Sequence, residues 1–232
     1  MGDFFTATNL KKSFSDLKSS SDFSVEISFS CEQKTMTGIV GQSGSGKSTI
    51  LRMIAGLEKA DAGAKIELDG KNITNEPPGK REIGFVFQNG ALFDHLRVVD
   101  NVAYGLVARK IPKKIAHQKA SEFLARFGMN GFEKRFPDTL SGGEAQRVSL
   151  ARTLILNPKL VLFDEPLSAL DAPLRKKAAE EIKNLQAEFG FTGIIVTHDI
   201  DEAKTLCQKI ILIKNGKIAW QGSSKDFGIE RY

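Results

Sequence analysis

The stretch that decides the fold is Gly41-Gln42-Ser43-Gly44-Ser45-Gly46-Lys47-Ser48-Thr49. It follows the apolar run 36–40, which predicts a short buried strand, and it leads into 50–55, which predicts a helix. Glycines let backbone N–H groups turn inward on an anion, and the first turn of a helix adds free N–H groups and partial positive charge. Strand, glycine-rich loop and helix in this order predict a phosphate-binding loop, in which Lys47 reaches the phosphates and the Ser48 hydroxyl binds Mg²⁺. The alternative is a chance match in a turn rich in glycine and serine, which the flanking elements disfavour.

The bulk composition is that of a soluble globular protein with one large domain or two small ones, at 232 residues, 41% hydrophobic and 26% charged. The net charge of +5 fits a polyanionic ligand, an anionic membrane surface or nucleic acid, and equally a mildly basic surface with no partner. No apolar run approaches the length of a membrane span, and residues 1–6 do not begin a signal peptide, so we expect a cytoplasmic chain. Cys31 and Cys207 match no metal or redox spacing and are expected to be free and buried.

Two kinds of apolar pattern predict strands in the first and last parts of the chain. Alternation over 4–30 predicts half-buried antiparallel strands around a turn at 18–21, and 64–70 alternates again. An unbroken apolar run at 160–163 predicts a strand buried on both faces, as in a parallel sheet, and another buried strand is expected at 193–197. The apolar run 83–87 has the length of a strand. Asn215-Gly216 predicts a two-residue hairpin joining strands at 210–213 and 217–220.

Between residues 89 and 156 the pattern is helical instead. Asp100 is expected to cap a helix over 101–109, the next helix carries an apolar stripe that includes Ile115, and a third helix covers 145–156. A later helix is expected over 172–189 with Leu174 facing inward. The prediction is therefore an α/β core formed by 1–88 and 157–232, with a helical insertion at 89–156.

Two acids, Asp164 and Glu165, follow the apolar run 160–163. A carboxylate at the carboxyl end of a parallel strand points into the crevice where ligands bind. Asp164 is expected to hold Mg²⁺, and Glu165 to polarise the attacking water as general base. The alternative, an ordinary acidic cap at the start of a helix, is disfavoured by the phosphate-binding loop earlier in the chain.

Further short motifs stand in one order along the chain: Gln88, then Leu140-Ser141-Gly142-Gly143-Glu144, then Ser168-Ala169-Leu170-Asp171, then His198. Together with Gly41–Thr49 and Asp164-Glu165 they resemble the nucleotide-binding subunit of ABC transporters over nearly the whole chain. The resemblance implies an α/β fold, with a P-loop NTPase core of the RecA-like type, an antiparallel β subdomain and an inserted α-helical subdomain. It also implies ATP and Mg²⁺ as cofactors.

The same resemblance implies the roles of individual residues. It implies catalysis by Lys47, Gln88, Glu165 and His198, and metal binding by Ser48, Gln88 and Asp164. It implies that Gly41–Thr49 binds the nucleotide, with further contacts from Phe14, Ser141, Gly142, Gly143 and Asp171. Gly142 and Gly143, the glycines of the signature motif Leu140–Glu144, would cover the nucleotide held by a second copy of the chain, in a head-to-tail homodimer. Phe14 would stack on adenine, although an ordinary core phenylalanine is nearly as good an interpretation.

Several segments look like bacterial importers of molybdate, sulfate, ferric iron, thiamine or polyamines, namely 81–88, 91–96, 101–106 and 164–171. Such a subunit works with integral membrane permease subunits and an extracytoplasmic solute-binding protein, and not with nucleic acid. It lies peripherally on the cytoplasmic face of the bacterial inner membrane, and we expect docking in a groove between Gln88 and the insertion, walled by 89–106. Because the chain ends at Tyr232, no C-terminal regulatory domain is expected.

Two other functions compete with solute import. One is an ABC ATPase that works with a membrane protein without transporting a solute, of the cell-division or lipoprotein-release type. The other is a P-loop kinase, which would explain neither the signature at Leu140–Glu144 nor His198. A neighbouring gene for a permease and a binding protein would favour import.

Overall fold

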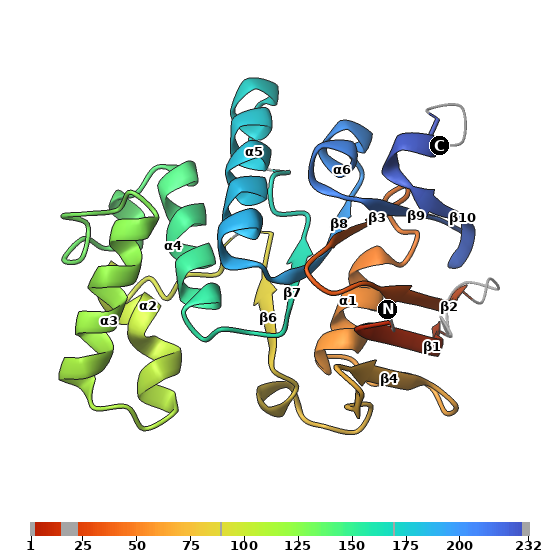
Figure 1. The fold of residues 1–232 in the computed structure, drawn as a ribbon, viewed down its shortest axis with the longest axis horizontal. Helices are drawn as coiled ribbons and strands as arrows, with labels where there is room; N and C mark the ends of the chain where they lie inside the picture. The colour runs from red at the N-terminus through yellow and green to blue at the C-terminus, as the bar shows by residue number, and fades with distance from the viewer. Residues whose placement is uncertain (1–2, 15–22, 89, 169, 229–232) are drawn as a thin grey trace.

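The structure is a computed structural model that describes residues 3–14, 23–88, 90–168 and 170–228. The predicted turn at 18–21, Asn89 and Ala169 lie outside the described residues. Its elements form two sheets and two groups of helices, arranged side by side in Figure 1.

A six-stranded sheet in the order β10-β9-β3-β8-β7-β6 forms the centre of the molecule. Its strands are β3 (Met36–Val40), β6 (Ile83–Val86), β7 (Leu160–Asp164), β8 (Thr192–Thr197), β9 (Lys209–Lys214) and β10 (Lys217–Ser223). Every residue of β3, β7 and β8 is buried, which confirms the unbroken apolar runs as strands covered on both faces. The pairs are parallel except β9 with β10, the predicted hairpin, in which Asn215 and Gly216 both have positive φ.

The register of this sheet brings distant parts of the chain to one edge. Val40 pairs with Thr197, Asp164 with Val196, and Val86 with Phe163. The residues that directly follow β3, β6, β7 and β8 therefore meet at the carboxyl edge of the sheet, which is where an α/β sheet places its ligand.

A second, antiparallel sheet packs beside the first, in the order β2-β1-β4-β5. It contains β1 (Phe5–Phe14), β2 (Phe23–Cys31), β4 (Lys65–Leu68) and β5 (Lys71–Asn72). Helix α1 (Lys47–Ala55) lies between the two sheets, because its side chains share one core cluster with residues of both. Phe14 pairs with Phe23 where β1 ends and β2 begins, whereas Phe5 pairs with Cys31 at the opposite end of the two strands. Cys31 and Cys207 are both buried and free.

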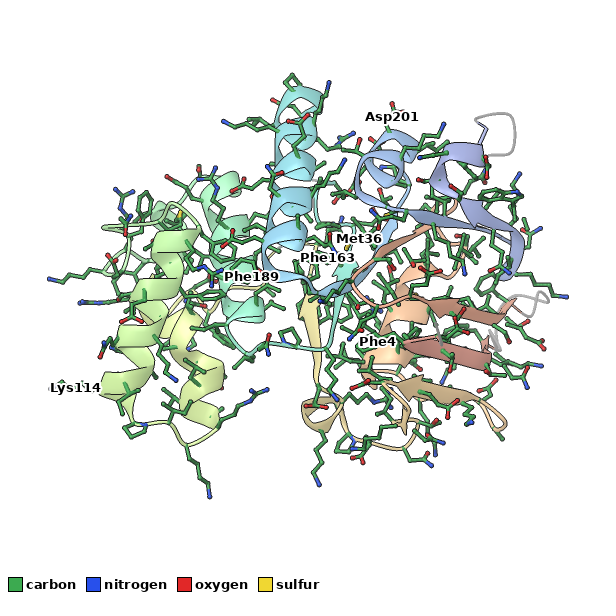
Figure 2. The ribbon with its side chains drawn as sticks, in the orientation of Figure 1. Phe4, Met36, Lys114, Phe163, Phe189 and Asp201 are labelled. Carbon is green, nitrogen blue, oxygen red and sulfur yellow. The ribbon has the colours of Figure 1, made fainter. Side chains whose placement is uncertain are left out.

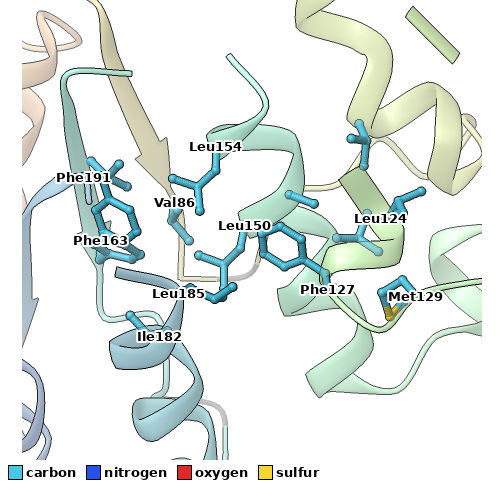
Figure 3. Packing of buried hydrophobic residues seen from close by; sticks show 14 of the residues in the cluster. Val86, Leu124, Phe127, Met129, Leu150, Leu154, Phe163, Ile182, Leu185 and Phe191 are labelled. Atoms are coloured by element: carbon cyan, nitrogen blue, oxygen red, sulfur yellow. The ribbon is translucent and has the colours of Figure 1, made fainter. Parts of the chain in front are cut away.

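Three helices stand between β6 and β7 in the chain: α2 (Val98–Ala108), α3 (Lys113–Arg126) and α4 (Gly142–Leu154). They form the left side of Figure 1, and Lys114 marks their outer tip in Figure 2. Their core is continuous with that of the sheet, since Leu150 and Leu154 of α4 join the cluster that contains Val86 (Figure 3).

The remaining helices are α5 (Ala172–Phe189), which follows β7, and α6 (Ile200–Leu206), which follows β8. Figure 2 shows Met36 of β3 and Phe163 of β7 close together beside α5. Short 3₁₀ turns complete the elements, at η1 (Pro78–Lys80), η2 (Pro137–Thr139) and η3 (Ser224–Asp226). Among the described residues, no helix is long and apolar enough to cross a membrane.

Three helix details predicted from the sequence are wrong. The N-cap position of α2 is Arg97 and not Asp100. Asp100 lies in the first turn of α2, and its Oδ1 is 2.9 Å from His117 Nε2 and 3.4 Å from Lys113 Nζ. Ile115 and Leu174 point outward, with 46% and 53% of their surfaces exposed. Both lie in the first turn of a helix. The element that packs against the apolar stripe of such a helix need not extend far enough to cover a residue in its first turn.

The fourth difference concerns α4, which begins at Gly142 rather than Ala145. Ser141 is its N-cap, and a reciprocal pair of hydrogen bonds with Glu144 places both signature glycines inside the first helical turn. The capping signal Ser-x-x-Glu was present in the sequence, and it outweighs the poor helix propensity of two glycines.

Candidate nucleotide site

The glycine-rich loop joins β3 to α1, and its glycines are required by geometry. Gly44 and Gly46 have φ of 78° and 98°, a region that side chains with a Cβ rarely adopt. A Cβ at Gly46 would collide with the Val25 side chain, and one at Gly41 would lie 2.5 Å from the carbonyl oxygen of Ile213. Gly46 directly precedes α1, so the loop ends at a helix N-terminus with no side-chain cap. That combination leaves backbone N–H groups available to an anion.

Lys47 is the first residue of α1, directly after the loop, and is only 4% exposed. Its Nζ donates to the carbonyl oxygens of Gly41 at 2.9 Å and Gln42 at 3.0 Å, and it is 3.7 Å from Glu165 Oε1. Burial lowers the pKa of Lys47, whereas the carboxylates of Glu165 and Asp164 act in the opposite direction. The ammonium group is thus held at the loop, beside the carboxylates that follow β7.

Ser48, the next residue, donates from its hydroxyl to Asp164 Oδ1 at 2.8 Å. These two oxygens come from α1 and from the end of β7, and Asp164 is 9% exposed. Mg²⁺ prefers oxygen ligands of this kind and keeps several positions for water and phosphate oxygens. A hydroxyl paired with a carboxylate fits that requirement, and among the described residues no group of three or more His, Cys, Asp or Glu forms a self-sufficient metal site.

Glu165 stands at the centre of the site in a strained backbone conformation. Its φ is 45°, unusual for a residue other than glycine, and its N–H donates to the Val196 carbonyl at 3.0 Å. Its two carboxylate oxygens face different partners: Oε1 faces Lys47, and Oε2 lies 3.1 Å from His198 Nδ1. His198 follows β8, so the parallel pairing of β7 and β8 is what brings the acid and the imidazole together.

Gln88 reaches this group indirectly. Its Nε2 donates to Ser168 Oγ at 3.0 Å, and the Ser168 hydroxyl in turn donates to the Glu165 carbonyl at 2.9 Å. The described structure has no hydrogen bond from Gln88 to Ser48 or Asp164. The sequence did not indicate a role for Ser168 beyond its place in the motif 168–171.

The signature residues lie apart from the phosphate-binding loop. Ser141 donates from its N–H and its hydroxyl to Glu144 Oε2, at 2.7 and 2.8 Å, and these bonds lower the pKa of Glu144. A Cβ on Gly143 would meet nothing within 4 Å, so this turn of α4 is open. Within the described chain, no hydrogen bond joins it to the residues 41–49. Asp171, another expected nucleotide residue, caps α5 by accepting from the N–H of Leu174 at 3.0 Å.

An aromatic pair stands beside the loop. Phe14 is 39% exposed and stacks on Phe23 with ring centroids 6.3 Å apart and an interplanar angle of 27°. A hollow of about 320 Å³ is lined by Phe23, Ile213, Lys214, Asn215 and residues 42–45, and Phe14 is not among its lining residues. Sequence reasoning missed Phe23, which an antiparallel register around the predicted hairpin would have placed opposite Phe14.

The fold and the loop together define a P-loop nucleotide-binding protein of the α/β class. The sequence matches the family model described as ABC transporter over residues 25–168, and the chain belongs to that family.

Curated relatives and solved structures agree with this membership. The chain is 44% identical to a Fe(3+) ion import ATP-binding protein of Rhizobium etli over 95% of its length and 61% of that protein, so it spans about three-fifths of this relative. It is 43% identical to a probable sulfate/thiosulfate import ATP-binding protein of Chlorella vulgaris, covering 94% of this chain and 90% of that one.

Two solved structures have the same fold. One is cbiO1 from Clostridium perfringens, part of an ABC transporter complex, with a TM-score of 0.83 and 28% identity over 97% of this chain and 90% of that one. The other is a dimeric ATP-binding cassette in a post-hydrolysis state bound to ADP and Pi, with a TM-score of 0.81 and 29% identity over 96% and 100%.

Proposed function

We propose that the protein is the ATP-hydrolysing subunit of an ABC importer. The observation that carries the proposal is the convergence of Lys47, Ser48, Asp164, Glu165 and His198 at the carboxyl edge of one parallel sheet, next to a loop shaped for phosphate. The names of the relatives support ATP binding and import, and they do not favour a partner role without transport.

The proposed chemistry assigns each residue a task that its position allows. The backbone of Gly41–Thr49 and the Lys47 ammonium hold the phosphates of ATP. Ser48 and Asp164, with Gln88 moving toward them, would hold Mg²⁺, and the bound ion would neutralise charge on the phosphates. Glu165 accepts the proton of the attacking water, and His198, next to its carboxylate, orients the γ-phosphate.

One chain supplies half of each composite site in this proposal. The open first turn of α4 presents the N–H groups of Gly142 and Gly143, whereas the N–H of Ser141 already donates to Glu144. A second copy, related by a two-fold axis, would place this turn over the γ-phosphate, with Asp171 near the interface. The dimeric structural neighbour supports such an arrangement.

The permease partner is proposed to dock in a groove of about 630 Å³ between the sheet and the helices α2 and α4. The groove is lined in part by Phe87 and Tyr104, which are 40% and 51% exposed. Exposed aromatic side chains at a concave site are typical of protein interfaces. This would place the protein peripherally on the cytoplasmic face of a membrane. The insertion 89–156 would carry the contact with the permease, and a solute-binding protein would work on the opposite side of the membrane. The transported solute would be chosen by those partners.

The test of the proposed function is the rate of ATP hydrolysis by the purified chain and its Glu165→Gln variant. The amide has the shape of the carboxylate but cannot accept the proton, so turnover should fall at least a hundred-fold while nucleotide affinity is kept. Glu180→Gln on the exposed side of α5 removes the same charge and should retain full activity. Undiminished hydrolysis by Glu165→Gln would remove Glu165 as the base.

A further inference from the structure

Arg175, in the first turns of α5, contacts two loops of the site with its two terminal nitrogens. Nη1 donates to Asp199 Oδ2 at 2.8 Å, and Nη2 donates to the carbonyl oxygen of Leu170 at 2.9 Å. Asp199 directly follows His198, and Leu170 belongs to the motif 168–171 that follows Glu165. None of the sequence motifs drew attention to Arg175.

These contacts close a ring around the Glu165–His198 pair. From Glu165, the ring runs through its carbonyl to the Ser168 hydroxyl at 2.9 Å and along the chain to Leu170. It crosses the Arg175 guanidinium to Asp199 and returns through His198 Nδ1 to Glu165 Oε2 at 3.1 Å. Apart from the two bonds of Arg175, the ring consists of covalent backbone and of hydrogen bonds between residues of the site that are described above.

The rest of the ring is anchored on the α6 side. Asp199 Oδ1 accepts from the Glu202 N–H at 3.0 Å, and the Asp199 N–H donates to Thr197 Oγ1 at 3.0 Å. Burial alone would raise the pKa of Asp199, but the bonds from Glu202 and Arg175 outweigh it and keep the carboxylate charged. Asp199 is thus a fixed acceptor to which α5 is joined by Arg175.

The contact between Arg175 and Asp199 lies beside a hollow and not within tightly packed apolar side chains. A hollow of about 490 Å³ lies between α5 and α6, and its lining includes Arg175, Asp199 and Glu202. Close apolar packing therefore does not hold the two helices together at this point. The fork of a guanidinium reaches two acceptors at once in a fixed geometry, which a single ammonium nitrogen on a flexible stem does not reproduce.

We propose that Arg175 is a positioning residue for ATP hydrolysis: it joins the loop after Glu165 to the loop after β8 and so holds His198 against the Glu165 carboxylate. The proposal rests on the roles of Glu165 and His198 given above. In the described structure no hydrogen bond or ion pair joins Arg175 to the phosphate-binding loop, so we expect its effect in the chemical step and not in nucleotide binding.

The test compares Arg175→Gln and Arg175→Lys with the matched control Lys177→Gln, which removes an exposed positive charge from the same helix. Arg175→Gln should lower kcat about ten-fold or more, because a small misplacement of a catalytic group is costly, while the KM for ATP stays within about two-fold. Arg175→Lys keeps the charge but not both bonds, and should fall between wild type and Arg175→Gln. Lys177→Gln should match wild type.

A double-mutant cycle with Asp199→Asn separates positioning from general destabilisation. Asparagine still caps α6 through its amide oxygen, but its amide nitrogen then faces Arg175 and cannot accept a hydrogen bond, so the ring is already open in that variant. Arg175→Gln should then lower kcat by less than about two-fold further. Equal fold-losses in both backgrounds, or a rise in KM without a fall in kcat, would overturn the proposal.

The same assay with Glu165→Gln distinguishes a failure of the positioning role of Arg175 from a failure of the proposed function. An inactive Glu165→Gln beside a fully active Arg175→Gln would overturn the ring and leave the proposed function standing. A fully active Glu165→Gln would overturn the role of Glu165 and the ring with it. Thermal unfolding of each variant checks that a loss of kcat is not a loss of folded protein; a folded fraction reduced in proportion to kcat would overturn the positioning role.

Discussion

Two glutamates near the site have opposite environments at the residue scale. Glu165 is partly exposed, and its two carboxylate oxygens face Lys47 and His198. Glu202, on α6, is only 6% exposed, and burial raises its pKa to about 7, with the Thr197 hydroxyl acting against the rise. Its Oε2 accepts from Thr197 at 2.6 Å, and Oε1 has no hydrogen-bond partner among the described groups. Glu165 is thus paired with side chains of the site, whereas burial favours the protonated form of Glu202.

The raised pKa of Glu202 predicts a stability that depends on pH. The folded protein holds this proton more tightly than the unfolded chain, whose value is near 4.5. The stabilisation is therefore complete below pH 4.5 and is lost as the pH rises toward 7. Glu202→Gln removes the titrating group and should therefore weaken this dependence on pH. Between pH 4.5 and 8, the unfolding free energy of the wild type should fall relative to that of the variant by on the order of 1–3 kcal/mol. Urea denaturation at several pH values measures this, and identical pH slopes would contradict it.

Helix α1 shows how a single side chain outside the site secures an element within it. Arg81, 5% exposed, donates from Nη1 to the carbonyl oxygens of Met53 and Ile54 at 3.0 and 2.7 Å, at the end of α1. Its Nε and Nη2 donate to the carbonyl oxygens of Glu76 and Thr74, both at 2.8 Å. Burial lowers the pKa of Arg81, yet four acceptors compensate the buried charge. The helix that begins with Lys47 is thus tied at its other end.

Replacing Arg81 should destabilise the fold without touching the phosphate-binding loop directly. Arg81→Met keeps an unbranched apolar stem but removes the guanidinium, which leaves four carbonyl oxygens without this donor. We expect a loss of about 2–4 kcal/mol in the free energy of unfolding, measured by urea denaturation. The exposed neighbour Lys80→Met should change stability by no more than about 0.5 kcal/mol. Equal stabilities of the two variants would show that the carbonyl groups find other donors.

At the scale of the whole molecule, the two turns that are proposed to bind phosphate belong to different layers. The phosphate loop opens α1 between the two sheets, whereas Ser141 opens α4 in the helical insertion. A Cβ on Gly142 would lie 3.9 Å from Leu170, so the signature turn is near the loop that follows Glu165. Among the described residues no hydrogen bond joins the signature turn to the phosphate-binding loop, which supports the proposal that a second copy completes both.

Blocking the signature turn should prevent that pairing. Ser141→Arg puts a long side chain where a second copy must approach, so the isolated chain should still bind ATP but fail to dimerise with it. Light scattering of the Glu165→Gln chain with and without this change measures ATP-driven dimerisation. Ser141→Thr keeps the hydroxyl and the N-cap and should dimerise normally. A normal ATP-driven dimer of the Ser141→Arg variant would refute the sandwich arrangement.

Some features of the protein were determined by the sequence alone because they depend on neighbours along the chain. The strand–loop–helix at 36–55, the buried strand before Asp164 and the Asn215-Gly216 hairpin all follow from side-chain period, backbone conformation and hydrogen bonds within a few residues. The outward turn of Ile115 and Leu174 could not be predicted in this way, because which side of a helix is covered depends on the element packed against it.

Only the tertiary structure decided which functional groups meet. The strand order β3-β8-β7-β6 places side by side segments that are far apart in the chain, and this brings His198 to Glu165 and Ser48 to Asp164. The bridge made by Arg175 and the Phe14–Phe23 pair have the same origin. Local residue patterns specify elements, but contacts between elements depend on the shared core and the register of the sheet, which no short stretch of sequence contains.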